Sequence, residues 1–288
     1  NVSKSRYYRD VDSDDVFIHL GVPCSFKLVK PILLKRLVSQ NLLLVGGEID
    51  TQACVLLSII NSWRNKDTNF EIWASEQYPT FKRYKDRWHQ AKCECDIRKI
   101  TERTEELIDN ISNNIITDRL IVCMGLDLLF DDFDDYISLL NLRKTSKKNS
   151  IDLWSLMNSP DVTQEQIRTY NNTTDSNNMD HDVIGDFRKN MNLLLSMASK
   201  KGIHFVFLFT HYQNYCASKI KASDCQHKVL FPMSKTESKD IANIDTSDLG
   251  DGMFVYSDGY KNFYMRPHIY RGVPCNGWII DNDTIIKL

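Results

Sequence analysis

The sequence lacks any apolar run near the roughly 20 residues that a membrane-spanning helix requires, so no membrane span is predicted. It also lacks an excess of either charge, because 36 lysines and arginines stand against 38 aspartates and glutamates, a formal net charge of −2 over 288 residues. A strongly basic balance marks many nucleic-acid-binding domains, and net charge therefore does not indicate DNA as a partner. The hydrophobic content of 42% is ordinary for a soluble protein. The length of 288 residues fits one large or two small domains.

No C-x-x-C pair occurs among the eight cysteines, which stand at positions 24, 54, 93, 95, 123, 216, 225 and 275. Cys54 and Cys123 lie inside apolar segments, which favours reduced, mostly buried thiols over a disulfide framework. The sequence also lacks an initiator methionine and a charged-then-apolar leader. We therefore expect a cytoplasmic domain of a longer protein, which includes the case of the cytoplasmic part of a membrane-attached protein.

Residues 41–63 are the stretch around which we expect the chain to be organised. The apolar run 42–45 ends at Gly46 and Gly47, which indicates a strand buried on both faces. Apolar residues then recur at helical spacing up to Trp63. A buried strand, a glycine-containing loop and a helix form the setting in which phosphate-binding loops occur.

This loop lacks the residues that bind phosphate. The functional pattern is G-x-x-x-x-G-K-[ST], in which backbone N–H groups surround the phosphates, lysine neutralises them and the hydroxyl holds Mg²⁺. Starting the pattern at Gly47 puts Gln52 at the second glycine, Ala53 at the lysine and Cys54 at the hydroxyl. Two acidic residues within the loop also oppose a triphosphate. On the loop alone, an ordinary strand–turn–helix that never bound phosphate remains an open interpretation.

The rest of the chain alternates strands and helices. Strands are predicted at 16–20, 69–74, 119–124, 203–209 and 228–232, and a late hairpin at 252–256 and 262–266; helices are predicted at 55–63, 100–115 and 183–201. Residues 1–16 are predicted to be a polar arm or linker end. Residues 17–288 are predicted to form a single domain with a polar insertion at about 141–182. This alternation predicts an α/β fold with a mostly parallel central sheet and helices on both faces.

Five segments, in their order along the chain, resemble the RecA-like P-loop ATPase domain of the FtsK/SpoIIIE family, which includes DNA translocases and type VII secretion ATPases. The segments are LLLVGGEIDTQACVLLSII, RLIVCMGLDLL, KKGIHFVFLFTHYQN, HKVLFPMSKTESKDI and LGDGMFVYSDG. They resemble, in turn, the family's phosphate-loop strand and helix, its second acidic motif, its Gly-Ile-His strand, its Ser-Lys-Thr-(Asp/Glu)-Ser turn and its Leu-Gly-x-Gly hairpin. The resemblance covers roughly residues 16–269 and implies a RecA-like P-loop NTPase fold.

Carried over residue by residue, the resemblance implies an ATP site whose chemistry is degenerate. Cys123 and Met124 stand where an Asp and a Glu would orient Mg²⁺ and activate water, and only Asp127 matches the acid that follows. Phosphoryl transfer depends on positioning and electrostatic stabilisation, so we expect the fold without catalytic residues, a bound cofactor or a metal. The ten positions of the family's ATP site are Gly46, Gly47, Gln52, Ala53, Cys54, Cys123, Met124, Asp127, Thr210 and His211.

The resemblance thus implies an inactive ATPase-like module of a translocase or secretion ATPase, acting in structure, regulation or docking. Its expected partners are other ATPase modules of the same chain or oligomer, and a protein or peptide substrate. Two alternatives stay open: an ATP/Mg-binding, DNA-translocating motor with atypical loops, and an unrelated α/β enzyme that uses Cys and His groups. In an oligomer, Lys235 and Arg266 are candidates for cations that act on a neighbour's site.

Other groupings of reactive side chains are weaker candidates. The aromatic and basic run at 76–88 suggests either contact with nucleic acid or an amphipathic surface helix with a solvated cationic face. The acidic run at 131–135 suggests either a cation site or a helix start. Metal or nucleophile candidates are His89 with Cys93 and Cys95, Cys225 with His227, and Cys216 with His211.

Overall fold

The computed structural model describes residues 16–24, 31–63, 69–88, 91–115, 118–131, 134, 183–270, 273, 278–281 and 284–287. The strands of the main sheet are β2 (Val22–Pro23), β4 (Leu42–Val45), β5 (Asn69–Ala74), β6 (Lys92–Glu94), β7 (Arg119–Met124), β8 (Ile203–Phe209), β9 (His227–Leu230), β10 (Phe254–Ser257) and β11 (Asn262–Arg266). Two small antiparallel sheets consist of β1 (Val16–Ile18) with β3 (Ile32–Leu34), and of β12 (Trp278–Asp281) with β13 (Thr284–Lys287).

The main sheet has the order β2-β11-β10-β9-β4-β8-β7-β5-β6. The strands from β9 to β6 are parallel to their neighbours, whereas β10, β11 and β2 are antiparallel. The predicted mostly parallel sheet and the late hairpin are therefore confirmed. The strand β4 lies between β8 and β9, so its carboxyl end is where the strand order reverses, the usual ligand position in open α/β sheets.

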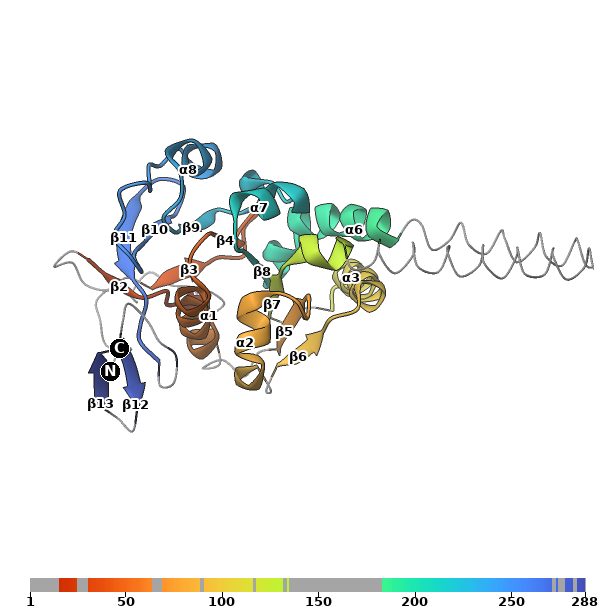
Figure 1. Cartoon of the computed structure of the whole chain (residues 1–288). Coiled ribbons are helices and arrows are strands. Elements are labelled where there is room, and N and C mark those ends of the chain that lie inside the picture. The colour runs from red at the N-terminus through yellow and green to blue at the C-terminus, as the bar shows by residue number, and fades with distance from the viewer. Residues whose placement is uncertain are drawn as a thin grey trace, which may run out of the picture.

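Helices cover both faces of the sheet, as Figure 1 shows. They are α1 (Ile49–Trp63), α2 (Pro79–Arg83), α3 (Ile97–Ser112), α6 (Val183–Met197), α7 (Tyr212–Ser218) and α8 (Lys235–Ala242), with short 3₁₀ turns at Lys85–Arg87, Ala198–Lys201 and Ala222–Asp224. Because side chains alternate along a strand, Leu42 and Leu44 belong to the core beneath α1 and α2. Leu43 and Val45 belong to the core beneath α3 and α6.

Most predicted strands are found at the predicted bounds, but two helices begin earlier than predicted. The helix predicted at 55–63 starts at Ile49, and the helix predicted at 100–115 starts at Ile97, where the Asp96 side chain accepts a hydrogen bond from the backbone N–H of Arg98. The predicted end of the 183–201 helix is confirmed, with Gly202 in the left-handed region at φ 79°. The arm at 1–15 and the insertion at 141–182 lie outside the described residues.

Two buried histidines meet at the turn that precedes β4. His204 Nδ1 lies 2.7 Å from the carbonyl oxygen of Gln40, and His227 Nε2 lies 3.2 Å from the side-chain oxygen of the same glutamine. Burial lowers the pKa of each imidazole to about 4 from an ordinary value of 6.5. Both rings are therefore neutral in the folded protein near pH 7.

We expect the free energy of unfolding to fall as the pH is lowered from 7 to 5. In the unfolded chain both histidines bind protons near pH 6.5, whereas in the folded chain they remain neutral down to about pH 4. The unfolded state thus gains protons across this window, which costs about 2 kcal/mol of stability per histidine. Urea unfolding at the two pH values measures this. A His227→Gln variant should lose less stability between pH 7 and 5 than the control His211→Gln, whose histidine is exposed. Equal losses in both variants would contradict the assignment.

Candidate functional site

The connection between β4 and α1 is too short to surround a phosphate. It consists of residues 46–48, because Gln52 N–H already donates to the Glu48 carbonyl oxygen at 2.9 Å and the helix begins at Ile49. The residues that would form the open part of a phosphate loop are wound into the first turn of α1. Gly46 and Gly47 have φ values of 86° and 88°, which only glycine adopts without strain.

Gln52 is the centre of a buried hydrogen-bond network at this point. Its Nε2 donates to the carbonyl oxygens of Gly46 at 2.7 Å and Phe209 at 3.3 Å. Its Oε1 accepts from the hydroxyl groups of Tyr78 at 3.0 Å and Thr80 at 2.7 Å. A glutamine amide offers two donor hydrogens and two acceptor lone pairs, and here all four are used. The Gln52 side chain, at the position of the motif's second glycine, therefore joins β4, β8 and the start of α2.

Aromatic rings close both sides of this network. A Cβ added to Gly47 would stand 2.7 Å from the ring of Phe231, and one added to Gly125 would stand 2.7 Å from the ring of Tyr78. Both rings are fully buried. The backbone at Gly47 and at Gly125 therefore lies against aromatic rings. In a P-loop ATPase the corresponding two loops lie against the phosphates and the metal ion.

The positions of the lysine, the hydroxyl and the two acids are packed into the core. Ala53, Cys54, Cys123 and Met124 each expose 0% of their surface. Burial raises the pKa of the Cys123 thiol well above its ordinary value, so this sulfur remains a neutral thiol. A phosphate at these four positions would meet only uncharged side chains. These residues do not fit Mg²⁺-ATP, because they offer neither the cation nor the carboxylates that it requires.

Asp127 and Thr210 are the two family-like polar residues that the fold does bring together. Asn214 Nδ2 donates to a carboxylate oxygen of Asp127 at 2.5 Å, and the Thr210 hydroxyl donates to Asn214 Oδ1 at 3.2 Å. Burial raises the pKa of Asp127, although the hydrogen bond from Asn214 partly offsets this. The network connects the carboxyl ends of β7 and β8, and Asn214 on α7 uses its amide in doing so.

A cavity of about 500 Å³ lies at the carboxyl ends of β4, β8 and β9. It is lined by Gly46, Gly47, Thr210 and His211 among the ten predicted positions, but not by the residues at the lysine, hydroxyl or metal-ligand positions. Of the described residues that line it, three are acidic and none is a lysine or arginine: Glu48, Glu237 and Asp251 carry the charge. Such a lining repels a triphosphate.

Two of the three Cys and His candidates, Cys225 with His227 and Cys216 with His211, do not form a reactive site among the described residues. Both ring nitrogens of His227 already have partners, Tyr256 and Gln40, and Cys225 is fully buried with its pKa raised by burial. No hydrogen bond joins Cys216 to His211 among the described contacts. Within the described ranges, no group of three His, Cys, Asp or Glu side chains is placed to hold a metal. His89 and part of the 131–135 run lie outside the described residues.

The aromatic and basic run at 76–88 is amphipathic rather than nucleic-acid-binding in its geometry. Its aromatic side chains are buried in the core, which excludes them from stacking on bases, and its lysines and arginines are exposed. The prediction of stacking contact is therefore wrong, because the apolar rings gain more from burial against α1. The buried rings are Tyr78, Phe81, Tyr84 and Trp88.

Sequence reasoning missed Tyr78, Thr80 and Asn214. Pro79 is a signal for the first turn of a helix, and it was available to place α2 at Pro79–Arg83. No local pattern shows that the two hydroxyls beside it reach Gln52. Lys235, a predicted trans-acting cation, pairs with Asp245 at 3.0 Å, and Arg266 lies exposed on β11.

Comparisons with known proteins find similarity in structure only. No protein-family model matches the chain, and no curated protein matches it in sequence. The pCW3 conjugation coupling protein TcpA, in its monomer form with ATPγS, has a TM-score of 0.56 at 9% identity, over 91% of this chain and 68% of that one. Thermomonospora curvata EccC (ATPases 2 and 3), in complex with a signal sequence peptide, has a TM-score of 0.51 at 9% identity, over 90% of this chain and 42% of that one.

The cytoplasmic domain of EssC has a TM-score of 0.50 at 13% identity, over 91% of this chain and 44% of that one. This chain thus spans about two thirds of TcpA and less than half of the EccC and EssC chains. None of the helices among the described residues is long and apolar enough to cross a membrane. The strand order and these similarities show that the chain has the RecA-like α/β fold of P-loop ATPase domains, the fold that the FtsK/SpoIIIE resemblance implies.

Proposed function

We propose that this chain is an ATPase-like module that does not hydrolyse ATP and acts by docking to neighbouring modules or to a polypeptide substrate. The observation that carries this proposal is the Gln52 network, in which one amide uses its four hydrogen-bonding positions inside the protein. A phosphate at the position of the Gln52 side chain would break these bonds. The cost of unpaired buried polar groups opposes this.

The proposed partners follow from the surface chemistry and from the similar proteins. The similar EccC structure contains ATPases 2 and 3 with a bound signal sequence peptide, which supports a polypeptide partner for this chain. DNA is disfavoured because the net charge is −2 and the aromatic rings of residues 78–88 are buried. We also propose a cytoplasmic location, since EssC is described as having a cytoplasmic domain of this fold.

Calorimetry with ATP and ADP at millimolar concentration, with and without Mg²⁺, tests the proposal. We expect no saturable heat, because the cavity offers carboxylates where a triphosphate needs cations. A coupled hydrolysis assay should give no turnover above background. The absence of binding would direct further work to polypeptide partners.

A pair of glycine variants makes a positive result interpretable. Gly47→Ala introduces a Cβ at φ 88° against the Phe231 ring, whereas Gly250→Ala meets only the Met253 sulfur at 3.5 Å. Circular dichroism would check that both variants fold. Nucleotide binding that disappears in Gly47→Ala and persists in Gly250→Ala would show a working phosphate site and overturn the proposal.

A further inference from the structure

A second cavity lies at the other end of β9 from the candidate site. Its volume is about 830 Å³, and its lining combines His227 at the start of β9 with residues of β10, β11 and the β1–β3 region. The candidate site, by contrast, adjoins Phe231 just beyond the end of β9. A volume of this size falls in the range of small-molecule sites, which are mostly apolar with a few placed polar groups.

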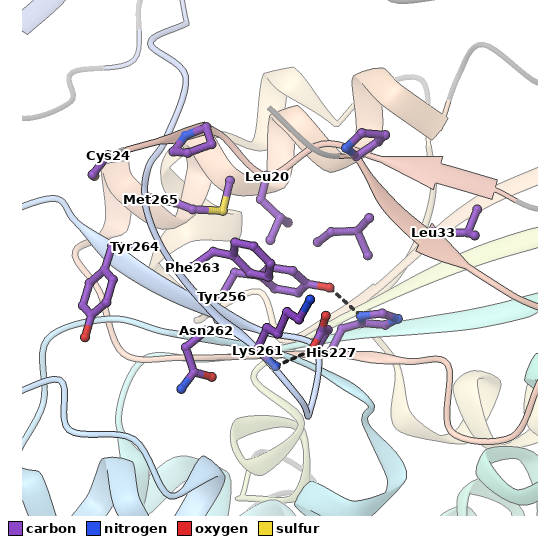
Figure 2. Close-up of a pocket in the computed structure, with 14 residues that line it drawn as sticks. Leu20, Cys24, Leu33, His227, Tyr256, Lys261, Asn262, Phe263, Tyr264 and Met265 are labelled. Atoms are coloured by element: carbon purple, nitrogen blue, oxygen red, sulfur yellow. Dashed lines mark hydrogen bonds between the residues drawn. The ribbon is translucent and has the colours of Figure 1, made fainter. Parts of the chain in front are cut away.

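One wall of the cavity is a series of nearly parallel rings on three adjacent strands. The rings of His227 and Tyr256 have centroids 6.0 Å apart at 18°, and those of Tyr256 and Phe263 have centroids 5.8 Å apart at 20°. Figure 2 shows Tyr256 and Phe263 overlapping, with the Tyr256 hydroxyl directed at His227. The faces of Tyr256 are thus turned to His227 and Phe263. Aromatic rings also prefer edge-to-face contact, so another planar ring can pack against the edges of this wall.

The opposite wall is aliphatic, and the cavity carries no net charge. Leu20 and Ile32 are buried side chains that line it, whereas the buried Met265 lies on the same face of β11 as Phe263 and extends the ring wall. Among the described lining residues, the charged side chains are Lys261 and Asp258, one of each sign. A neutral ligand is therefore favoured over an ion of either sign.

The hydrogen-bonding state of Tyr256 can be deduced from its neighbours. The side-chain oxygen of Gln40 accepts from the backbone N–H of Lys35 at 3.4 Å, which assigns it as the acceptor of the amide. His227 Nε2, 3.2 Å from that oxygen, must then carry the proton of the neutral ring. His227 Nδ1 is left as an acceptor, so the Tyr256 hydroxyl donates to it at 2.8 Å. The phenol oxygen retains its lone pairs and offers an acceptor to the cavity.

We propose that this cavity binds a neutral, planar aromatic molecule that carries an N–H or O–H donor. The ring packs edge-to-face against the Phe263 and Tyr256 wall, and the donor reaches the phenol oxygen of Tyr256. The site is independent of the candidate site at the carboxyl ends of the strands and does not rest on the absence of ATPase activity.

Indole and benzothiophene, two bicyclic rings of similar shape of which only indole has an N–H, are the probes. Calorimetry on the full chain should show indole binding about tenfold more tightly than benzothiophene, the effect of one hydrogen bond. Tyr256→Phe should remove this preference and leave benzothiophene binding unchanged. Amide NMR shifts should map both probes to residues 254–266.

Tyr260→Phe is the matched control, because this tyrosine is 90% exposed at the hairpin tip and does not line the cavity. It should retain the tenfold preference for indole. A tripeptide with a central tryptophan shows whether the indole ring can come from a polypeptide. If the tripeptide binds as tightly as indole, the cavity accepts a tryptophan side chain; if only indole binds, the cavity accepts a free small molecule. The proposal fails if neither bicyclic probe binds, or if the preference for indole is the same in Tyr256→Phe as in the parent chain.

Discussion

Replacing Gln52 with alanine is expected to lower the free energy of unfolding by about 4 kcal/mol. The change removes an amide that is fully buried and leaves the Gly46 carbonyl and the Tyr78 and Thr80 hydroxyls without their partner. Phe209 keeps one hydrogen bond, because its carbonyl oxygen also accepts from the N–H of Gly46 at 3.0 Å. Urea unfolding monitored by tryptophan fluorescence measures the loss.

Gln213→Ala is the matched control for this prediction. Gln213 is exposed on α7 and makes one hydrogen bond, to Glu237 at 3.2 Å, so its loss should change stability by less than about 0.5 kcal/mol. A loss in Gln52→Ala as small as in the control would show that the network does not hold the loop. That result would remove the main support for the proposed function.

Gln52→Glu tests the direction of the hydrogen bonds. The substitution puts a carboxylate oxygen beside the carbonyl oxygens of Gly46 and Phe209, where Nε2 now donates. This environment disfavours the charged form and would raise the pKa of the new carboxyl group above its unfolded value. The folded state would then bind more protons at this carboxyl than the unfolded state, so this variant should regain stability relative to the parent chain as the pH falls towards 5. Stability of Gln52→Glu that decreases over the same range relative to the parent chain would contradict the orientation of the amide.

Replacing Glu71 with alanine is expected to cost about 4 kcal/mol. Glu71 on β5 is buried and pairs with Arg103 on α3 at 2.8 Å and with Arg119 on β7 at 2.6 Å. Burial alone would raise the pKa of this carboxyl, but the hydrogen bond from Arg103 and the charge of Arg119 more than offset it, and the pKa is lowered. Removing the carboxylate takes away the ion-pair partner of the buried Arg119 and leaves Arg103 paired only with the exposed Glu106.

Urea unfolding of Glu71→Ala beside Glu76→Ala measures this effect. Glu76 pairs with Lys85 at 3.3 Å, but both side chains are about two thirds exposed, so the surface pair should contribute less than about 1 kcal/mol. The parent chain should also lose stability as the pH falls below the ordinary glutamate value of 4.5, and Glu71→Ala should lose less in that window. A double-mutant cycle with Arg119→Met isolates the pair, and a coupling energy near zero would contradict a stabilising ion cluster.

Much of the fold follows from local sequence patterns. The strands at 69–74, 119–124 and 203–209 are found at their predicted bounds, because buried strands of parallel sheets are short apolar runs with clear polar or glycine ends. The start of α1 was not predicted, because the motif alignment treated 48–52 as loop. In the structure, Glu48 accepts the first helical hydrogen bond and the motif's loop becomes a helical turn.

The candidate site was predictable in what it has lost but not in what replaces it. The resemblance puts Gln52, Ala53 and Cys54 at the positions of the motif's glycine, lysine and hydroxyl, so the sequence alone predicts the loss of phosphate-binding chemistry. That Tyr78 fills the adjoining space depends on a hydrogen bond to a residue 26 positions earlier in the chain. The aromatic and basic run at 76–88 left both stacking on nucleic acid and an amphipathic surface helix open, and only the packing of its rings on the core decided for the second.

The sequence by itself determined the α/β class, the order of the strands and helices along the chain, and the absence of the lysine, hydroxyl and acids of an ATP site. Only the tertiary structure decided how that site is closed, because Gln52 binds the carbonyl of Phe209, 157 residues away, and the hydroxyl of Thr80, 28 residues away. Local patterns encode which residues prefer burial and in which element they lie. Hydrogen bonds between distant segments depend on the packing of the whole sheet. These bonds bury Gln52 and fix the connection between β4 and α1.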